Sequence, residues 1–256
     1  MYISQTYSTN TLLRDEYPDA PHLFTIRTGF QTAGRGQAGN GWESEADRNL
    51  LFSTLIRPDD LPATEQFSLC MAVSLALYRT VESLMQPYDT APLAIKWPND
   101  LYYGDLKLAG ILIENIIQGA NIARSVAGIG LNVNQTAFHA APNPVSLTQI
   151  TGRTYDIELI LNNFLAELPR VLALPACELR TAYMARLYRS EGFHPYQERE
   201  VSVQPTNNIS PEQAQAEPRP VFLAEIAGIT PFGELILRDS DGREHTYHYK
   251  QIRYVL

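Results

Sequence analysis

The sequence predicts an α+β fold made of two units, a larger one over residues 1–190 and a small all-β one over residues 191–256. Three observations support this prediction. A chain of 256 residues can hold one large domain with a small one beside it. Up to residue 190, short apolar runs rich in β-branched residues are mixed with longer amphipathic segments. After Gly192 only short segments of alternating polarity follow, so we expect the boundary near residue 190.

The first half of the chain mixes helix and strand signals. Ser8, Thr9 and Asn10 are residue types that commonly cap helices, and a short helix is expected to follow over 11–16. Apolar residues at helical spacing predict a long helix over 66–85. Apolar runs with β-branched residues predict strands at 22–27, 49–56, 93–97, 108–117 and 122–133. The glycine breaks in the later runs are typical of strands in a sheet that helices cover on one face.

The second half is expected to hold two helices and a small set of strands. The polar, proline-bearing stretch 133–152 predicts a long loop, and loops of that length are often functional. Amphipathic periodicity predicts helices over 156–173 and 177–190. Alternating segments predict strands at 200–203, 221–227, 234–238 and 245–249, with a proline-bearing loop over 204–220.

Composition excludes several classes of protein. The formal net charge of −8 argues against a nucleic-acid binder, because the phosphate backbone attracts clustered positive charge. No apolar run reaches the roughly 18 residues of a membrane span, and the N-terminus lacks the basic and apolar regions of a signal peptide. Cys70 and Cys177 lie far apart in apolar contexts, as buried thiols do. We therefore expect a cytoplasmic protein that binds neither DNA nor a membrane.

The segment Gly34–Gly39 matches the pattern G-x-G-x-x-G, which by itself is a weak signal. A dinucleotide site needs a helix to begin at the third glycine, but residues 40–48 have no helical apolar face. A protein kinase would also need H-R-D and D-F-G motifs, which do not follow. A glycine loop containing Arg35 can instead hold a phosphate or carboxylate. A tight hairpin with an exposed arginine explains the same residues, and the sequence leaves both interpretations open.

Lysine is scarce, and two of the three lysines lie close together. Lys96 belongs to the run Lys96-Trp97-Pro98-Asn99-Asp100, and Lys107 begins a predicted strand. Because an unpaired buried ammonium is costly, each of these lysines needs an anionic partner. A ligand with phosphate and carboxylate groups would supply one. The alternative is a structural salt bridge with Asp100, Asp105 or Glu114.

Taken together, these motifs resemble the biotin protein ligases (biotin–[acetyl-CoA-carboxylase] ligases). The matching features are Ser8–Asn10, Gln31–Gly36, Gly39 with Trp42, Lys96–Asp100, Lys107–Leu112 and Gly128–Asn132, in that order. The resemblance implies a catalytic domain with a mixed sheet, related to class II aminoacyl-tRNA synthetases, and a small SH3-like β-barrel domain. It also implies a reaction in which biotin and ATP form biotinyl-5′-AMP, and a lysine of a biotin carboxyl carrier domain then accepts the biotin.

The resemblance assigns roles to individual residues. Those implied to bind biotin are Ser8, Thr9, Asn10, Gln31, Gly34, Arg35, Gly36, Gln37, Lys107 and Gly110. Those implied to bind ATP are Gly36, Gly39, Trp42, Lys96, Asn99, Asp100 and Asn132. Those implied to act in catalysis are Lys107, Arg35, Lys96 and Asp100. Asp100 is also the candidate carboxylate to orient Mg²⁺ or Lys96.

The chain departs from several relatives in its glycine loop, where Gln37, Ala38 and Asn40 stand in place of arginines. Some relatives carry an N-terminal DNA-binding domain, and a biotin motif that begins at Ser8 leaves no room for one. The partners implied are biotin, ATP, the carrier domain of a biotin-dependent carboxylase and a second copy in a homodimer. Two other functions fit the same residues: a lipoyl or octanoyl ligase of the same superfamily, and a biotin-binding protein without catalysis.

Overall fold

A computed structural model describes residues 1–36, 40–85, 91–199 and 219–255. The chain divides into two compact units, residues 1–188 and residues 189–256. The boundary expected at residue 190 lies close to this division. Each unit contains one β-sheet, and the predicted α+β class is confirmed.

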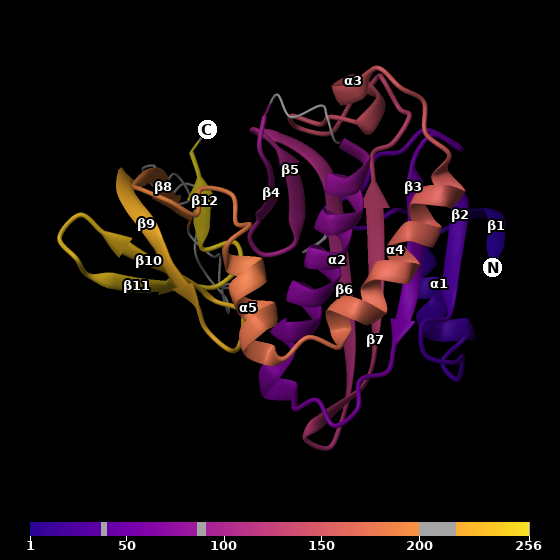
Figure 1. Cartoon of the computed structure of the whole chain (residues 1–256), viewed down its shortest axis with the longest axis horizontal. Helices are drawn as coiled ribbons and strands as arrows, with labels where there is room; N and C mark the ends of the chain where they lie inside the picture. Colours follow the sequence, from indigo (N-terminus) through magenta and orange to yellow (C-terminus); the bar gives the residue numbers. More distant parts are fainter. Residues whose placement is uncertain (37–39, 86–90, 200–218, 256) are drawn as a thin grey trace, which may run out of the picture. The chain divides into compact units, whose positions relative to one another are not determined.

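The larger unit is built on a seven-stranded mixed sheet with the strand order β1-β2-β3-β7-β6-β5-β4 (Figure 1). Its strands are β1 (Tyr2–Thr6), β2 (Thr25–Gln31), β3 (Leu50–Ile56), β4 (Leu93–Lys96), β5 (Asp100–Tyr103), β6 (Leu106–Gln118) and β7 (Asn121–Leu131). Only the β1–β2 pair is parallel, and the other neighbours are antiparallel. The long β6–β7 hairpin is therefore the centre of the sheet.

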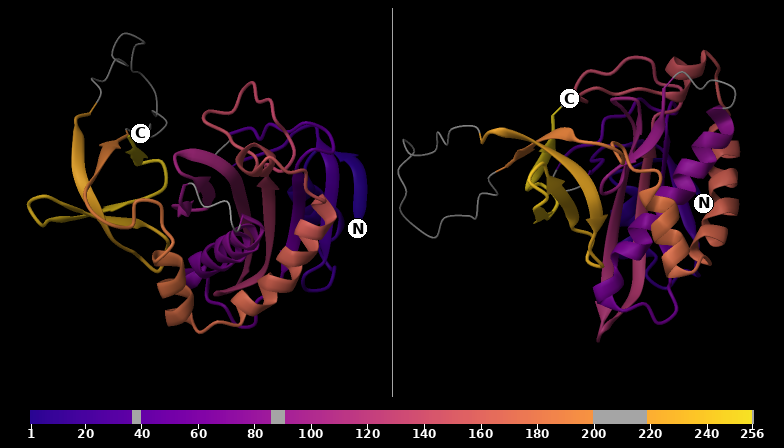
Figure 2. Two further views of the ribbon diagram at one scale, coloured as in Figure 1. Left: turned by 45° about the horizontal axis from the view of Figure 1, so that its top comes forward. Right: turned by 60° about the vertical axis from the view of Figure 1, so that its left-hand side comes forward.

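Helices cover the two faces of this sheet unequally. The helices are α1 (Thr9–Glu16), α2 (Phe67–Met85), α3 (Leu147–Thr151), α4 (Ile157–Leu172) and α5 (Ala176–Met184), with a 3₁₀ turn η2 (Ala63–Glu65) before α2. Both views of Figure 2 show α2 and α4 on the same side of the strands. Phe164 of α4 packs edge-to-face on Phe52 of β3, with ring centroids 5.1 Å apart. This face of the sheet is the main hydrophobic core of the unit.

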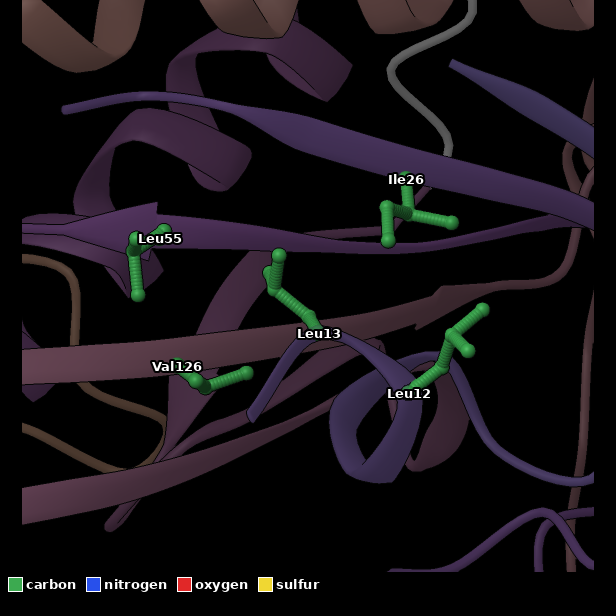
Figure 3. Close-up of a cluster of buried hydrophobic side chains, with 5 residues drawn as sticks. All are labelled: Leu12, Leu13, Ile26, Leu55 and Val126. Atoms are coloured by element: carbon green, nitrogen blue, oxygen red, sulfur yellow. The ribbon is translucent and has the colours of Figure 1, made fainter. Parts of the chain in front are cut away.

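Helix α1 packs on the opposite face. Its residues Leu12 and Leu13 meet Ile26, Leu55 and Val126 in a buried cluster (Figure 3). Side chains alternate along a strand, so Leu55 points away from the face on which Phe52 lies. The short α1 leaves part of its face uncovered by helix, unlike the face beneath α2 and α4.

The segment Ala63–Met85 is long and apolar enough to cross a membrane by length and composition alone. More than half of it is buried within the larger unit, where α2 contacts α4, α5 and the sheet. These contacts are those of the core helix of a globular domain.

The helices predicted over 66–85 and 156–173 and the strand predicted over 49–56 are confirmed. The strand predicted at 22–27 instead begins at Thr25, because Leu23 has a positive φ of 65° that a strand cannot contain. The sequence also did not predict β1, which has few apolar residues, or β5, which directly follows the turn at Trp97-Pro98-Asn99.

Two other predictions need correction. The predicted loop over 133–152 contains the helix α3, which Ser146 begins through a capping box with Gln149. Gly152 ends it in the left-handed conformation. The helix predicted over 177–190 ends at Met184.

The smaller unit is a five-stranded antiparallel sheet with the order β11-β10-β9-β8-β12. Its strands are β8 (His194–Glu198), β9 (Val221–Ile229), β10 (Leu235–Asp239), β11 (Glu244–Tyr247) and β12 (Ile252–Tyr254). Tyr196 and Tyr254 pack in its core with ring centroids 5.0 Å apart. The sequence predicted β9, β10 and β11 but neither β8 nor β12. The strand expected at 200–203 and nearly all of the loop expected at 204–220 lie outside the described residues.

The Phe52–Phe164 contact gives a test of the core. Replacing the fully buried Phe164 by alanine should lower the free energy of unfolding by about 3–5 kcal/mol, through lost burial and the cavity left behind. The matched control is Leu159→Ala on the same helix, since 56% of Leu159 is exposed and its loss should cost about 0.5 kcal/mol or less. Urea unfolding followed by circular dichroism measures both. Equal losses would contradict this packing.

Candidate functional site

The face of the sheet that carries α1 is bare of side chains along part of β6 and β7. Gly110 pairs with Gly130 across the two strands, and Gly128 lies two residues earlier on β7, on the same face. We call the main chain at these three glycines the glycine floor. A Cβ at Gly128 would overlap the side chain of Asn10, and one at Gly130 would overlap the indole of Trp42. The side chains of Asn10 and Trp42 thus lie directly on the main chain of β7.

Four polar side chains meet where α1 begins, and we call Thr9, Asn10, Gln31 and Ser53 the polar cluster. The main-chain N–H and the hydroxyl of Thr9 donate to Gln31 Oε1 over 2.8 and 3.1 Å. Ser53 Oγ lies 2.7 Å from Thr9 Oγ1 and 2.6 Å from Asn10 Oδ1. Ser8, the N-cap of α1, is buried beside them and makes no side-chain capping bond. Four residues predicted to bind biotin therefore lie together: Ser8, Thr9, Asn10 and Gln31. Ser53, which was not predicted, lies with them.

Glu114 of β6 connects this cluster to the positive charges nearby. Its carboxylate accepts from the Asn10 amide over 2.8 Å and from Arg14 over 3.0 Å, and forms an ion pair with Arg35 at 3.5 Å. Both Glu114 and Ser53 are polar residues inside apolar strand patterns, and that irregularity is the sequence signal by which they could have been found. The sequence analysis named Glu114 as one of three acidic partners for the two lysines. In the structure Glu114 pairs with Arg14 and Arg35 instead.

Lys107 lies at the edge of the glycine floor and is paired with Asp100. The Lys107 Nζ to Asp100 Oδ2 distance is 2.6 Å, and about 30% of each side chain is exposed. The same ammonium lies 5.8 Å from the centroid of the Trp42 ring. Of the three acidic partners that the sequence offered, the structure selects Asp100. An ion pair this exposed is worth about 0–1 kcal/mol, so an anionic ligand can compete for Lys107 at little cost.

Lys96 occupies the same face, on β4. It is directly opposite Asp100 in the β4–β5 pairing, while Tyr102 points to the same side from β5. The Lys96 ammonium donates to the hydroxyl of Tyr102 over 3.1 Å and lies 4.5 Å from its ring centroid. The structure thus places both predicted lysines and Asp100 together.

The glycine-rich segment forms a hairpin within the residues that the structure describes. Gly36 N–H donates to Asn40 O over 2.6 Å, and Trp42 N–H donates to Gly34 O over 3.0 Å. Gln37 and Gly39, both predicted ligand residues, lie outside the described residues.

The one arginine of this hairpin, Arg35, is 44% exposed and donates to Thr11 Oγ1 over 2.8 Å. The hairpin interpretation thus fits the geometry, and the arginine points toward α1 and Glu114.

Two predicted nucleotide residues are bound to main chain. The Asn99 amide donates to Ile111 O, and Ile111 N–H donates to Asn99 O over 3.2 Å. The Asn132 amide donates to Val145 O over 3.1 Å. The Asn132 Oδ1 atom is buried and has no hydrogen-bond partner among the described residues. Asn99 therefore ties the start of β5 to β6, whereas Asn132 keeps an acceptor unused.

A family model described as the biotin/lipoate A/B protein ligase family matches residues 2–132. The bifunctional ligase/repressor BirA of Escherichia coli K12 is 31% identical over 189 residues, which are 74% of this chain and 54% of that protein. The biotin–[acetyl-CoA-carboxylase] ligase of Mycobacterium tuberculosis is 32% identical over 170 residues, 65% of this chain and 61% of that protein. The chain thus spans little more than half the length of these relatives. A ligase of the same name from Paracoccus denitrificans is 29% identical over 94% of this chain and 95% of its own length.

Solved structures show the same fold. A biotin protein ligase from Aquifex aeolicus, in complex with biotin and ATP, superposes with a TM-score of 0.74 at 19% identity, covering 100% of this chain and 98% of that one. A biotin protein ligase-like protein of unknown function from Silicibacter superposes with a TM-score of 0.66 at 9% identity, over 96% and 92% of the two chains. The resemblance to biotin protein ligases drawn from the motifs is confirmed. Because the family model covers half of its length, the chain belongs to the biotin/lipoate A/B protein ligase family.

Proposed function

We propose that the protein is a biotin protein ligase. It would form biotinyl-5′-AMP from biotin and ATP and then transfer the biotinyl group to a lysine of a carrier domain. The observation that carries the proposal is the convergence of the polar cluster, Lys107 and Trp42 on one face of the sheet. The names of the relatives support it, as do the biotin and ATP bound in the Aquifex structure.

The proposal divides the face into two subsites. Ser8, the polar cluster and the hairpin at Gly34, Arg35 and Gly36 would hold biotin, with hydroxyl and amide groups that match its ureido ring. Gln37 and Gly110 complete this predicted set. Trp42, Lys96, Asn99, Asp100 and Asn132, with Gly36 and Gly39, would hold ATP. Asn132 Oδ1 is an unused buried acceptor, which favours a ligand donor beside it.

Lys107 lies at the edge of the glycine floor that the two subsites share, and we propose it as the catalytic residue. In the first step a biotin carboxylate oxygen attacks the α-phosphorus, the bond to the β-phosphate oxygen breaks, and pyrophosphate leaves. In the second step a carrier lysine amine attacks the acyl carbon, AMP leaves, and the amine proton passes to solvent. An ammonium held beside the reacting groups stabilises the negative charge that develops in both steps. Arg35 and Lys96 would add positive charge, and Asp100 would orient Lys107.

Mg²⁺ would enter this site with ATP. Among the described residues, no group of three histidine, cysteine or acidic side chains is arranged to hold a metal. Asp100 is the carboxylate that the proposal gives to the ion, with one of its oxygens already paired with Lys107. That fits Mg²⁺, which commonly binds one or two carboxylates together with substrate phosphates and neutralises their charge.

The acetyl-CoA carboxylase in the relatives' names supports a biotin carboxyl carrier domain as the protein partner. The proposal places the reaction in the cytoplasm, in keeping with the two free thiols Cys70 and Cys177. A second copy of the chain in a homodimer and the lack of DNA binding belong to the same proposal.

The family name covers both biotin and lipoate, so the choice of acid is the first test. The purified chain is given ATP with either biotin or lipoate, and with either a biotin carboxyl carrier domain or a lipoyl domain. We expect the mass of the carrier domain to rise with biotin only. Lipoate attached to the lipoyl domain, without biotin transfer, would show the other ligase. Biotin binding without pyrophosphate release would show a binding protein.

The role of Lys107 predicts an unequal effect of its removal. Lys107→Ala should slow biotin-dependent ATP–pyrophosphate exchange about 100-fold or more, because a charge that acts in the transition state is lost. Biotin affinity from titration calorimetry should fall far less. Lys250→Ala, which removes an exposed lysine of the smaller unit, is the control and should leave both values unchanged. Equal losses of exchange and affinity in the Lys107 variant would make it a binding residue only.

The glycine floor predicts a sensitive position beneath the biotin subsite. Gly128→Ala should displace the Asn10 side chain and weaken biotin binding at least about tenfold, since the hydrogen bonds of Asn10 to Ser53 and Glu114 are then lost. Gly228→Ala is the matched control on a strand of the smaller unit, where an added Cβ would meet only Ile236 Cδ1 at 3.8 Å. Titration calorimetry with biotin measures both variants, and an unchanged affinity for Gly128→Ala would remove Asn10 from the subsite.

A further inference from the structure

Glu43, the residue after Trp42, is held by three consecutive main-chain N–H groups. His139 N–H donates to Glu43 Oε1 over 2.7 Å, and those of Ala140 and Ala141 donate to Oε2 over 2.8 and 2.9 Å. Successive N–H groups that converge in this way form an anion-binding concavity. Partial burial opposes the charge, but these three hydrogen bonds outweigh it and lower the pKa of Glu43. We call this contact the Glu43 clasp.

The clasp is one of several contacts between the segment after Trp42 and the segment after β7. Glu45 N–H donates to Gln135 Oε1 over 2.9 Å, and Asn134 N–H donates to Arg48 O over 2.7 Å. The clasp lies nearest to Trp42, and among the contacts named here between described residues it is the one in which a charged side chain takes part. Hydrogen bonds to a charged group are about twice as strong as neutral ones.

The main chain is held by hydrogen bonds on both sides of Trp42. Its indole lies on Gly110 and Gly130, with the Lys107 ammonium 5.8 Å from the ring centroid. Its Nε1 atom is buried and has no hydrogen-bond partner among the described residues. On one side, Trp42 N–H is bound to Gly34 O. On the other side, the clasp fixes the residue that follows.

We propose that Glu43 is a positioning residue of the nucleotide subsite: by binding the main chain of residues 139–141, it holds Trp42 on the glycine floor. The inference rests on the proposed function, in which Trp42 contacts ATP. Glu43 itself touches neither substrate. Its carboxylate joins two segments that are nearly 100 residues apart in sequence, so the segment after β7 and the segment that carries Trp42 are held in place together.

The test compares Glu43→Gln with Glu45→Gln in the full chain. Glutamine keeps the shape of the side chain but loses the charge and one acceptor oxygen. Even when its oxygen takes the place of Oε2 and keeps the N–H groups of Ala140 and Ala141, its NH2 group faces the N–H group of His139, which loses its acceptor. Glu45 is exposed two residues away, and its carboxylate makes no hydrogen bond among the described residues, so it is a matched control. In biotin-dependent ATP–pyrophosphate exchange, Glu43→Gln should raise the KM for ATP about tenfold. The KM for biotin and kcat should stay within about twofold, and Glu45→Gln should change none of these.

A second readout does not need catalysis. The chain has two tryptophans, and Trp97 is buried, so acrylamide quenching of the fluorescence reports mainly on Trp42. Quenching of the ligand-free protein should increase in Glu43→Gln and not in Glu45→Gln. If Glu43→Gln does not fold, Glu43→Asp takes its place with a smaller expected increase, because the charge remains but its reach is shorter.

The outcomes separate this inference from the function it rests on. Unchanged quenching and an unchanged KM for ATP in Glu43→Gln would overturn the positioning role, as would a joint rise of both KM values with a fall in kcat. A wild-type chain that forms no pyrophosphate would overturn the proposed function, while the quenching experiment would still decide whether Glu43 holds Trp42.

Discussion

The site depends on the absence of side chains at three positions of the central hairpin. Gly110, Gly128 and Gly130 bring the main chain of β6 and β7 to the surface of the sheet, so that Asn10 and Trp42 can lie on it. Because Asn10 belongs to α1 and Trp42 to the glycine-rich hairpin, these contacts restrict the positions of both segments. Lys107, at the edge of the same floor, then lies close to the Trp42 ring. A methyl group at either glycine of β7 would therefore disturb more than its own surroundings.

The charged groups of the site differ from its neutral groups in how firmly they are held. Lys107 and Arg35 have carboxylate partners within 4 Å, but these pairs are partly exposed and contribute little free energy. An incoming carboxylate or phosphate can therefore exchange with Asp100 or Glu114. The hydrogen bonds among Thr9, Asn10 and Ser53 are buried, and breaking one without replacement costs about 1–3 kcal/mol. The neutral hydrogen bonds of the polar cluster are thus held more firmly than the ion pairs of Lys107 and Arg35.

Much of this site could be predicted because its residues occur in short contiguous motifs. Asp100 was one of three acidic partners that the sequence offered for Lys107, and hydrophobic periodicity was enough to define α2. Glu43 could not be predicted, because its partners are main-chain N–H groups whose convergence depends on the conformation of a distant loop. β1 is an edge strand of five residues whose pattern carries too little apolar signal. A contact that depends on main-chain geometry and not on residue type leaves no pattern in the neighbouring sequence.

The two faces of the sheet give neighbouring residues of one strand different tasks. On β3, Phe52 packs against α4 in the core, whereas Ser53 faces the opposite way and belongs to the polar cluster. The face with α1 is not polar throughout, because Leu55, two residues after Ser53, belongs to the buried cluster of α1. Substitutions at Phe52 and at Leu55 are therefore both expected to lower the stability of the fold, on opposite faces of the sheet, whereas a substitution at Ser53 acts on the polar cluster. Along β3, a single step in the sequence thus moves from the core to the polar cluster, although the face that holds the polar cluster also contributes to the core.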